Sequence, residues 1–491
     1  MAKNEKMVHK GFGFYLFLFI LILFAAFMII VTIMMFSPKK VILGLQYFTY
    51  NDEYEVSKYT DSEEEQPISF AELDRIVVNC HSASVSFEKT AASKEDSVVV
   101  VNKTSGFAKS NQNVDFKYSV VYGVNDTTKA KVMTINVTET EGFLRFTNDV
   151  RVVIRVPLTS EYNFKTAEKT TEIVVTTTSG SVTIGNNSAP SDSTQNGNLD
   201  IDNLSVSTKS GNINITKFND KTFSNLSLNT GSGSFTTELE EVATEHTARL
   251  ATSSGRYTFK NISCKEPIEL NLGNGRFAVE TLTGSLNLVA QSANVTAGNV
   301  TGDFSANEAA DIINKSIVVV DEVGGDVSFP IAKASNLTFK KVNGNVNIKT
   351  TSGSVTMGEN APIANIVSIE TESGRINTKV GFARADLKHT FISKSGKIDL
   401  EFDDLGGANY VHSETGDVNV AFKSKSQFTL KLKKADGAAY EKLDSKLNLT
   451  FINADQYSYP LQVNGYTGEI NFLDIETNGR ITAELQKITE A

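Results

Sequence analysis

The stretch that decides the fold is TTTSGSVTIGNNSAP, residues 176–190, because a nearly identical stretch, KTTSGSVTMGENAP, begins at Lys349. The octets Thr177–Ile184 and Thr350–Met357 differ at one position and lie 173 residues apart. Such a pair is either a duplicated site or a structural unit that the chain uses more than once. The residues around the shared Ser-Gly pair distinguish these two interpretations.

The glycine of that pair recurs at nearly constant spacing along the chain. Consecutive spacings are 22, 22 and 20 residues in one block and 21, 22 and 20 in a second block. A fixed period of this kind indicates a repeat architecture, and the two octets lie close to eight repeats apart. We assign one structural turn to Gly180, Gly211, Gly233, Gly255, Gly353, Gly374, Gly396 and Gly416, with Gly275 in the same alignment and Gly479 in a weaker unit.

The residues flanking these glycines alternate between apolar and polar. The position five residues before the glycine is always apolar, and the positions two and four after it are apolar in most repeats. Period-two alternation indicates strands with one buried and one exposed face. The position three before the glycine is Thr or Ser in all but one repeat and has the parity of the buried positions, so we expect its hydroxyl just inside a corner. We expect the Ser-Gly step to need a positive φ, which glycine adopts without steric cost.

Two all-β architectures fit this unit, a hairpin sandwich and a β-solenoid. Identical residues in identical columns favour the solenoid, because stacking rewards repetition. The predicted fold is an all-β β-solenoid (β-helix) with coils of about 20–22 residues, preceded by one N-terminal transmembrane helix. The predicted organisation is a cytoplasmic N-terminus (1–10), the transmembrane helix (11–36), an acidic extracellular stalk (37–66), irregular N-terminal β coils (67–170), regular solenoid repeats (171–424) and C-terminal coils with a cap (425–491).

The segment Gly11–Phe36 is the one strongly helical candidate. It holds 26 residues without a charge, and about 20 suffice to cross a bilayer. A cleaved signal peptide is the alternative, although Ser37-Pro38-Lys39-Lys40 follows in place of a small-residue cleavage site. The acidic flank after the helix favours an N-terminus inside the cell. We therefore expect a single-pass protein of the cell membrane with an extracellular C-terminal domain.

Charge and cysteine content restrict the partners. The net charge is −10 and all but one of the acidic residues lie beyond the first forty positions, so nucleic acid is not an expected partner. Cys80 and Cys264 have no metal-binding or redox spacing, and we expect two buried free thiols. We expect no cofactor and no metal site.

At this point the chain resembles a known family. An N-terminal membrane helix, LDRIVVNCHSASVSFEK at residues 73–89 and many TxSGxVxI units are similar to the bacterial adhesin-like family of β-strand-repeat envelope proteins. The resemblance covers roughly residues 70 to 420, and the stretch from Gly284 to Asn343 departs from the pattern. It implies a β-solenoid exposed at the cell surface and supplies no catalytic motif. Some members are encoded near envelope-stress regulators, which implies a role in stress sensing as one alternative.

An enzyme acting on polysaccharide is another alternative, because β-helices can carry carboxylate pairs on neighbouring coils. The densest candidate is Asp399, Glu401, Asp403 and Asp404, which we interpret as a solvated edge. No histidine lies in a nucleophile or zinc motif. The leading hypothesis is a non-enzymatic, membrane-anchored, adhesin-like protein. Its expected partners are the membrane, through residues 11–36, and a surface glycan, matrix component or envelope protein.

Overall fold

The computed structural model describes most of the chain. The described residues are 12–36, 41–42, 44–61, 64–90, 95–109, 116–124, 130–139, 144–157, 164, 170–185, 199, 201–216, 222–306, 313–358, 366–380, 387–402, 405–423, 426–438, 447–450 and 461–486.

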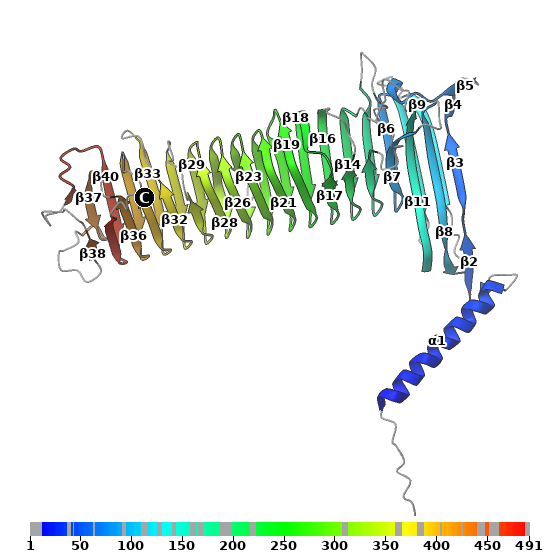
Figure 1. Cartoon of the computed structure of the whole chain (residues 1–491), viewed down its shortest axis with the longest axis horizontal. Helices are drawn as coiled ribbons and strands as arrows, with labels where there is room; N and C mark the ends of the chain where they lie inside the picture. Colours follow the sequence, from blue (N-terminus) through cyan, green and yellow to red (C-terminus); the bar gives the residue numbers. More distant parts are fainter. Residues whose placement is uncertain are drawn as a thin grey trace, which may run out of the picture.

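One α-helix, α1 (Phe12–Phe36), precedes the β-structure. Within it, Phe14–Thr32 is long and apolar enough to cross a membrane and is not buried against the rest of the protein. The helix therefore fits either a single-pass anchor or a signal sequence. The remaining elements form a long rod of short strands, which confirms the predicted all-β solenoid (Figure 1).

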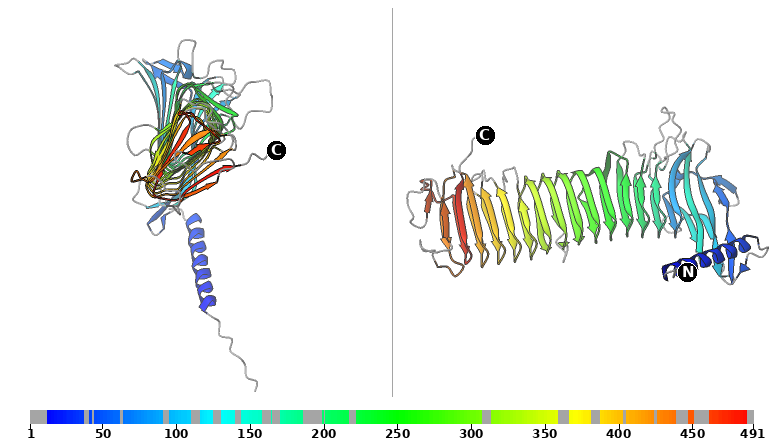
Figure 2. Two further views of the ribbon diagram at one scale, coloured as in Figure 1. Left: turned by 90° about the vertical axis from the view of Figure 1, so that its left-hand side faces the viewer. Right: turned by 60° about the horizontal axis from the view of Figure 1, so that its bottom comes forward.

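Each regular coil contributes two strands, one to each of two parallel stacks that run the length of the rod (Figures 1 and 2). The first stack holds β6 (Arg75–Cys80), β12 (Glu172–Thr177), β14 (Asn203–Thr208), β16 (Phe223–Thr230), β18 (Glu241–Thr252), β20 (Ile268–Leu272), β22 (Leu286–Gln291), β24 (Phe304–Ala306), β25 (Ile313–Asn314), β27 (Val327–Lys333), β29 (Val346–Thr350), β31 (Val367–Thr371), β33 (Lys388–Ser393) and β35 (Ala408–Ser413). The second stack holds β7 (Ser84–Thr90), β13 (Val182–Ile184), β15 (Ile213–Ile215), β17 (Ser234–Thr237), β19 (Arg256–Cys264), β21 (Arg276–Thr283), β23 (Asn294–Val300), β26 (Ile317–Val323), β28 (Asn336–Val342), β30 (Val355–Met357), β32 (Ile376–Val380), β34 (Ile398–Phe402) and β36 (Val418–Lys423).

Strands pair in register, so that like residues stack on like residues. Ile173 pairs with Leu204 in the first stack, and Val182 pairs with Ile213 in the second. Burial alternates along each strand, and the inward side chains form one continuous core between the stacks. The ladder continues through β22 to β28, where the sequence departs from the repeat pattern. Shared ladders are what make the fold stable, because a single coil buries too little surface to fold alone.

The threonine column lies inside the corner between the two strands of a coil, as predicted. These side chains are buried, and their hydroxyls bond to the backbone of their own corner. Thr230 Oγ1 donates to the carbonyl oxygen of Gly233 at 3.0 Å. In another coil Thr371 Oγ1 accepts from the amide of Gly374 at 2.8 Å. The hydroxyl thus satisfies backbone groups that the turn leaves unpaired.

The reason predicted for the corner glycines is wrong. None of the eight assigned glycines has φ in the left-handed region. Glycine is required instead by a close approach between coils. A Cβ built on Gly374 would lie 1.9 Å from the carbonyl oxygen of Gly353, and one on Gly211 would lie 1.9 Å from that of Gly180. The glycine column therefore stacks backbone directly on backbone.

The N-terminal end of the rod is closed by longer strands. The first coil, β6 and β7, lies between β12 and β13 on one side and β10 (Lys131–Glu139) and β11 (Leu144–Pro157) on the other. Two antiparallel strands, β9 (Phe116–Val124) and β8 (Ser97–Lys109), then pair with β10 and β11. The parallel ladder therefore ends in antiparallel pairs at this end.

Residues 45–56 differ from the extended stalk expected for 37–66. They form β2 (Leu45–Thr49) and β3 (Asp52–Val56), which pair antiparallel with β8, and Tyr54 stacks on Tyr118 with 4.4 Å between ring centroids. The physical reason is the length of β8, whose second edge would otherwise leave a row of backbone groups unpaired. The other elements of this end are β1 (Val41–Ile42), β4 (Lys58–Asp61), β5 (Glu64–Pro67) and the 3₁₀-helix η1 (Phe70–Glu72).

The C-terminal end does not follow sequence order. The last strands of the chain, β40 (Phe472–Thr477) and β41 (Ile481–Gln486), stack directly on β35 and β36. The earlier strands β37 (Phe428–Lys433) and β38 (Leu447–Thr450) lie outside them, and β39 (Leu461–Val463) pairs antiparallel with β37. Figure 1 shows β40 on the inner side of β37. The final coil is thus inserted beneath an outer cap formed by residues that precede it.

Candidate functional site

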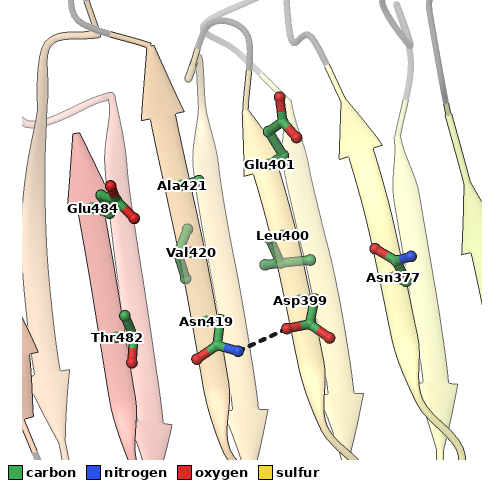
Figure 3. A pocket seen from close by; sticks show the side chains of 9 residues that line it. All are labelled: Asn377, Asp399, Leu400, Glu401, Asn419, Val420, Ala421, Thr482 and Glu484. Atoms are coloured by element: carbon green, nitrogen blue, oxygen red, sulfur yellow. Dashed lines mark hydrogen bonds between the residues drawn. The ribbon is translucent and has the colours of Figure 1, made fainter. Parts of the chain in front are cut away.

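A shallow pocket of about 210 Å³ lies on the outer face of the second stack near the C-terminal end. It crosses four adjacent strands, β32, β34, β36 and β41 (Figure 3). The lining residues are Asn377, Asp399, Leu400, Glu401, Asn419, Val420, Ala421, Thr482 and Glu484.

Strand register places the polar side chains of this pocket in two parallel columns. One column runs from Asn377 through Asp399 and Asn419 to Thr482. The second column holds Lys379, Glu401, Ala421 and Glu484 in the same four strands. Because Ala421 is the smallest member of its column, the surface is hollowed between the two glutamates.

Asp399 is the best-connected charge of the pocket. Its carboxylate accepts from Arg375 Nη2 at 2.6 Å and from Asn419 Nδ2 at 2.7 Å, the bond drawn in Figure 3. Lys397 Nζ lies 2.7 Å from Asp399 Oδ1, the oxygen that also accepts from Asn419. Partial burial opposes ionisation, but these hydrogen bonds outweigh it and hold the pKa of Asp399 below its usual value. Asp399 is therefore an ionised acceptor whose charge is already balanced.

The two glutamates of the pocket differ. Glu401 pairs with Lys379 at 3.0 Å, whereas Glu484 is exposed and has no ion pair with any described residue. The uncharged members Asn377 and Thr482 add further hydrogen-bonding groups. The pocket thus presents mixed donors and acceptors with one unbalanced negative charge.

The structure describes two of the four residues of the predicted carboxylate cluster. Asp399 and Glu401 share the outer face of β34, as their parity predicted, whereas Asp403 and Asp404 lie outside the described residues. The sequence reasoning missed Asn377, Asn419 and Thr482. Each of these residues lies three positions after a turn glycine, as Asp399 does, so reading that polar column of the alignment would have placed all three beside Asp399.

The other candidate groups do not gather into a site. Cys80 and Cys264 are buried free thiols, and burial raises the pKa of Cys80 to about 12. A thiol that is hard to deprotonate is a poor nucleophile. Within the described ranges, no group of three or more His, Cys, Asp and Glu side chains could hold a metal ion. The assigned turn glycines lie on the corners of the coils, and none of them lines the pocket.

A family model described as Toastrack DUF4097 matches residues 73–448. The chain belongs to this family. Among solved structures, a protein from Clostridium sporogenes ATCC 15579, described as a "putative cell adhesion protein", matches at 7% identity, covering 89% of this chain and 100% of the other, with a TM-score of 0.14. That TM-score is too low for the match to support an argument about either protein. No curated protein matches the chain.

Proposed function

We propose that this Toastrack protein is a non-enzymatic, single-pass membrane protein whose rod binds a surface glycan, matrix component or envelope protein outside the cell. The family assignment and the apolar N-terminal helix support this proposal. Repeat rods of this kind offer long, regular lateral faces, which suit the binding of extended partners.

The observation that carries the proposal is the ionisation of the Asp399 carboxylate, which its hydrogen-bond partners favour. Cleavage of a glycosidic bond needs one carboxyl group with a raised pKa to protonate the leaving oxygen. Asp399 has the opposite environment, because Arg375 and Lys397 hold it ionised. The pocket is therefore suited to accepting hydrogen bonds from ligand hydroxyl groups. Its volume of about 210 Å³ is below the usual range for drug-sized ligands, so it suits a single ring-sized unit.

The test uses full-length protein in detergent, incubated with a panel of envelope polysaccharides. We expect binding to one or more polymers without any new reducing ends. Asp399→Asn should weaken binding at the pocket, whereas Asp321→Asn, which removes an ion-paired aspartate from the same stack, should not. New reducing ends that disappear in Asp399→Asn or Glu401→Gln would show that the enzyme alternative is correct.

Topology is tested separately. Protease added outside intact cells should remove the rod and leave a small membrane fragment. Complete protection of the rod would contradict the proposed orientation. A mature chain that begins after residue 36 would show that the helix is a cleaved signal.

A further inference from the structure

The outer face of the first stack carries a pair of aromatic side chains near the C-terminal end of the rod. Of the described aromatic residues in strands β12 to β41, only Tyr410 and Phe472 are not buried. Their rings meet edge to face, with centroids 5.3 Å apart. All other aromatic side chains of these strands lie in the core. The two rings therefore mark one outer surface as different from the rest.

A lysine flanks each ring. Lys388 Nζ lies 4.7 Å from the centroid of Tyr410, and Lys431 Nζ lies 4.4 Å from that of Phe472. The four residues come from four adjacent parallel strands, β33, β35, β40 and β37. We call Lys388, Tyr410, Phe472 and Lys431 the aromatic–lysine row. At about 4.8 Å per strand, its two outer strands lie roughly 14 Å apart.

The charges of the row remain available for a ligand. Neither Lys388 nor Lys431 forms an ion pair with a described residue. Two carboxylates lie on β40 beside the row: Asp474, opposite Lys431 in register, pairs with Lys433 at 3.4 Å, and Glu476 lies 3.6 Å from His412 Nδ1. The chain is acidic overall, but charges beyond about 8 Å are screened at physiological ionic strength. The row is therefore locally cationic.

We propose that the aromatic–lysine row is a docking surface for an acidic polysaccharide whose sugars carry carboxylate groups. Aromatic rings offer apolar faces and edges against which a pyranose ring can pack. The two ammonium groups, at opposite ends of the row, pair with carboxylates on separated sugar units of the same polymer. A polyphosphate would satisfy the lysines but would leave the two rings without a partner, so charge complementarity together with the rings favours the sugar polymer.

The insertion of the final coil creates this surface. Phe472 lies between Tyr410 and Lys431 only because β40 stacks between β35 and β37. The strands of the row lie at the end of the rod farthest from the N-terminal strands (Figure 1). This inference deepens the proposed function, because it names a ligand class for the rod.

The test measures binding of oligogalacturonate to full-length protein in detergent by calorimetry. We expect wild-type binding to weaken at least tenfold in Lys388→Gln/Lys431→Gln and in Tyr410→Leu/Phe472→Leu. The leucine pair keeps apolar bulk on an outer face, so the rod should still fold, which its thermal unfolding verifies. The matched control is Lys349→Gln/Lys394→Gln, which removes the same charge from ion-paired lysines of the same stack.

Three results would overturn the inference. These are absence of wild-type binding, equal binding of inorganic polyphosphate or neutral dextran, and leucine variants that bind like wild type. The binding assay uses protein in detergent and does not depend on the orientation of the chain in the membrane. A protease experiment that contradicts the proposed topology would therefore leave the result of the binding assay unchanged. Shortened oligogalacturonate would instead identify the enzyme alternative.

Discussion

The corners of the coils are built in two ways, although they form one continuous column. In most coils the corner position is glycine, and each glycine stacks on the carbonyl group of the preceding corner residue. In three middle coils the same position holds Ala293, Ser316 and Ser335. The inter-coil hydrogen bonds persist, as in the 2.9 Å bond from the amide of Asn336 to the carbonyl oxygen of Ser316.

The two kinds of corner differ in where the backbone takes a positive φ. In the middle coils the residue before the corner adopts φ of 57° at Ser292, 49° at Lys315 and 49° at Ala334. The assigned corner glycines have no such residue before them. In these middle coils the Cβ is accommodated where the preceding residue adopts a left-handed conformation and redirects the chain. Steric contact between coils therefore decides which corners require glycine.

The largest expected effect comes from Gly374→Ala. Its Cβ would lie 1.9 Å from the carbonyl oxygen of Gly353, and backbone cannot yield as a side chain can. We expect a loss of at least about 3 kcal/mol in the free energy of unfolding, measured by denaturant titration with circular dichroism. If positive φ were the reason for glycine, alanine would cost only about 1 kcal/mol.

The matched variant is Ala293→Gly, in the same column of a middle coil. Because this corner already accommodates a Cβ, we expect a loss of only about 0.5–1 kcal/mol from added chain entropy. Equal effects of Gly374→Ala and Ala293→Gly would remove the distinction between the two kinds of corner.

The second effect concerns the core behind the corners. Middle coils bury Phe304, Phe329 and Phe339, whereas a later glycine-cornered coil buries His389. His389 Nδ1 accepts from the amide of Val367 at 3.2 Å, and burial lowers the pKa of His389 to about 4. In the unfolded chain His389 takes up a proton near pH 6.5, whereas in the folded protein it does so only near pH 4. The contribution of the neutral, buried His389 to the free energy of unfolding is therefore fully present above pH 6.5 and is lost as the pH drops toward 4.

At 1.36 kcal/mol per pKa unit, the loss over this window is about 3 kcal/mol. Unfolding of wild type and His389→Leu at pH 7, 5.5 and 4 measures it. The free energy of unfolding of wild type minus that of His389→Leu should decrease, and can change sign, as the pH falls. A constant difference would mean that His389 does not titrate in this window.

The column alignment in the sequence predicted the solenoid, the coil length and the buried threonines, because stacked coils repeat the same packing requirement. It did not predict features that depend on contacts between coils. The role of Gly374 depends on a carbonyl group of the preceding coil. The position of Phe472 depends on insertion of the last coil beneath β37 and β38, where the repeat spacing is lost. The ion pair of Arg375 with Asp399 also joins two coils, whereas Lys397 precedes Asp399 by two residues in the same coil.

A smaller effect is expected from removing one corner hydroxyl. Thr230 is fully buried and donates to the carbonyl oxygen of Gly233 at 3.0 Å. Thr230→Val keeps the shape but leaves that carbonyl without this donor, so we expect a loss of about 1–2 kcal/mol. Thr258→Val, on the outer face of β19, is the control and should change stability by less than about 0.5 kcal/mol. A similar result for both would mean that the hydroxyl does not support the corner.

The smallest effect has the opposite sign. Ala334 has φ of 49°, a conformation that disfavours a Cβ and that glycine adopts freely. Ala334→Gly should therefore stabilise the protein by up to about 1 kcal/mol, although added freedom in the unfolded chain offsets part of this gain. The same exchange at Ala293, where φ is not positive, should destabilise. Opposite signs at these two alanines, which lie two coils apart, would show that the middle corners depend on backbone conformation, whereas equal signs would leave close approach as the only constraint at both.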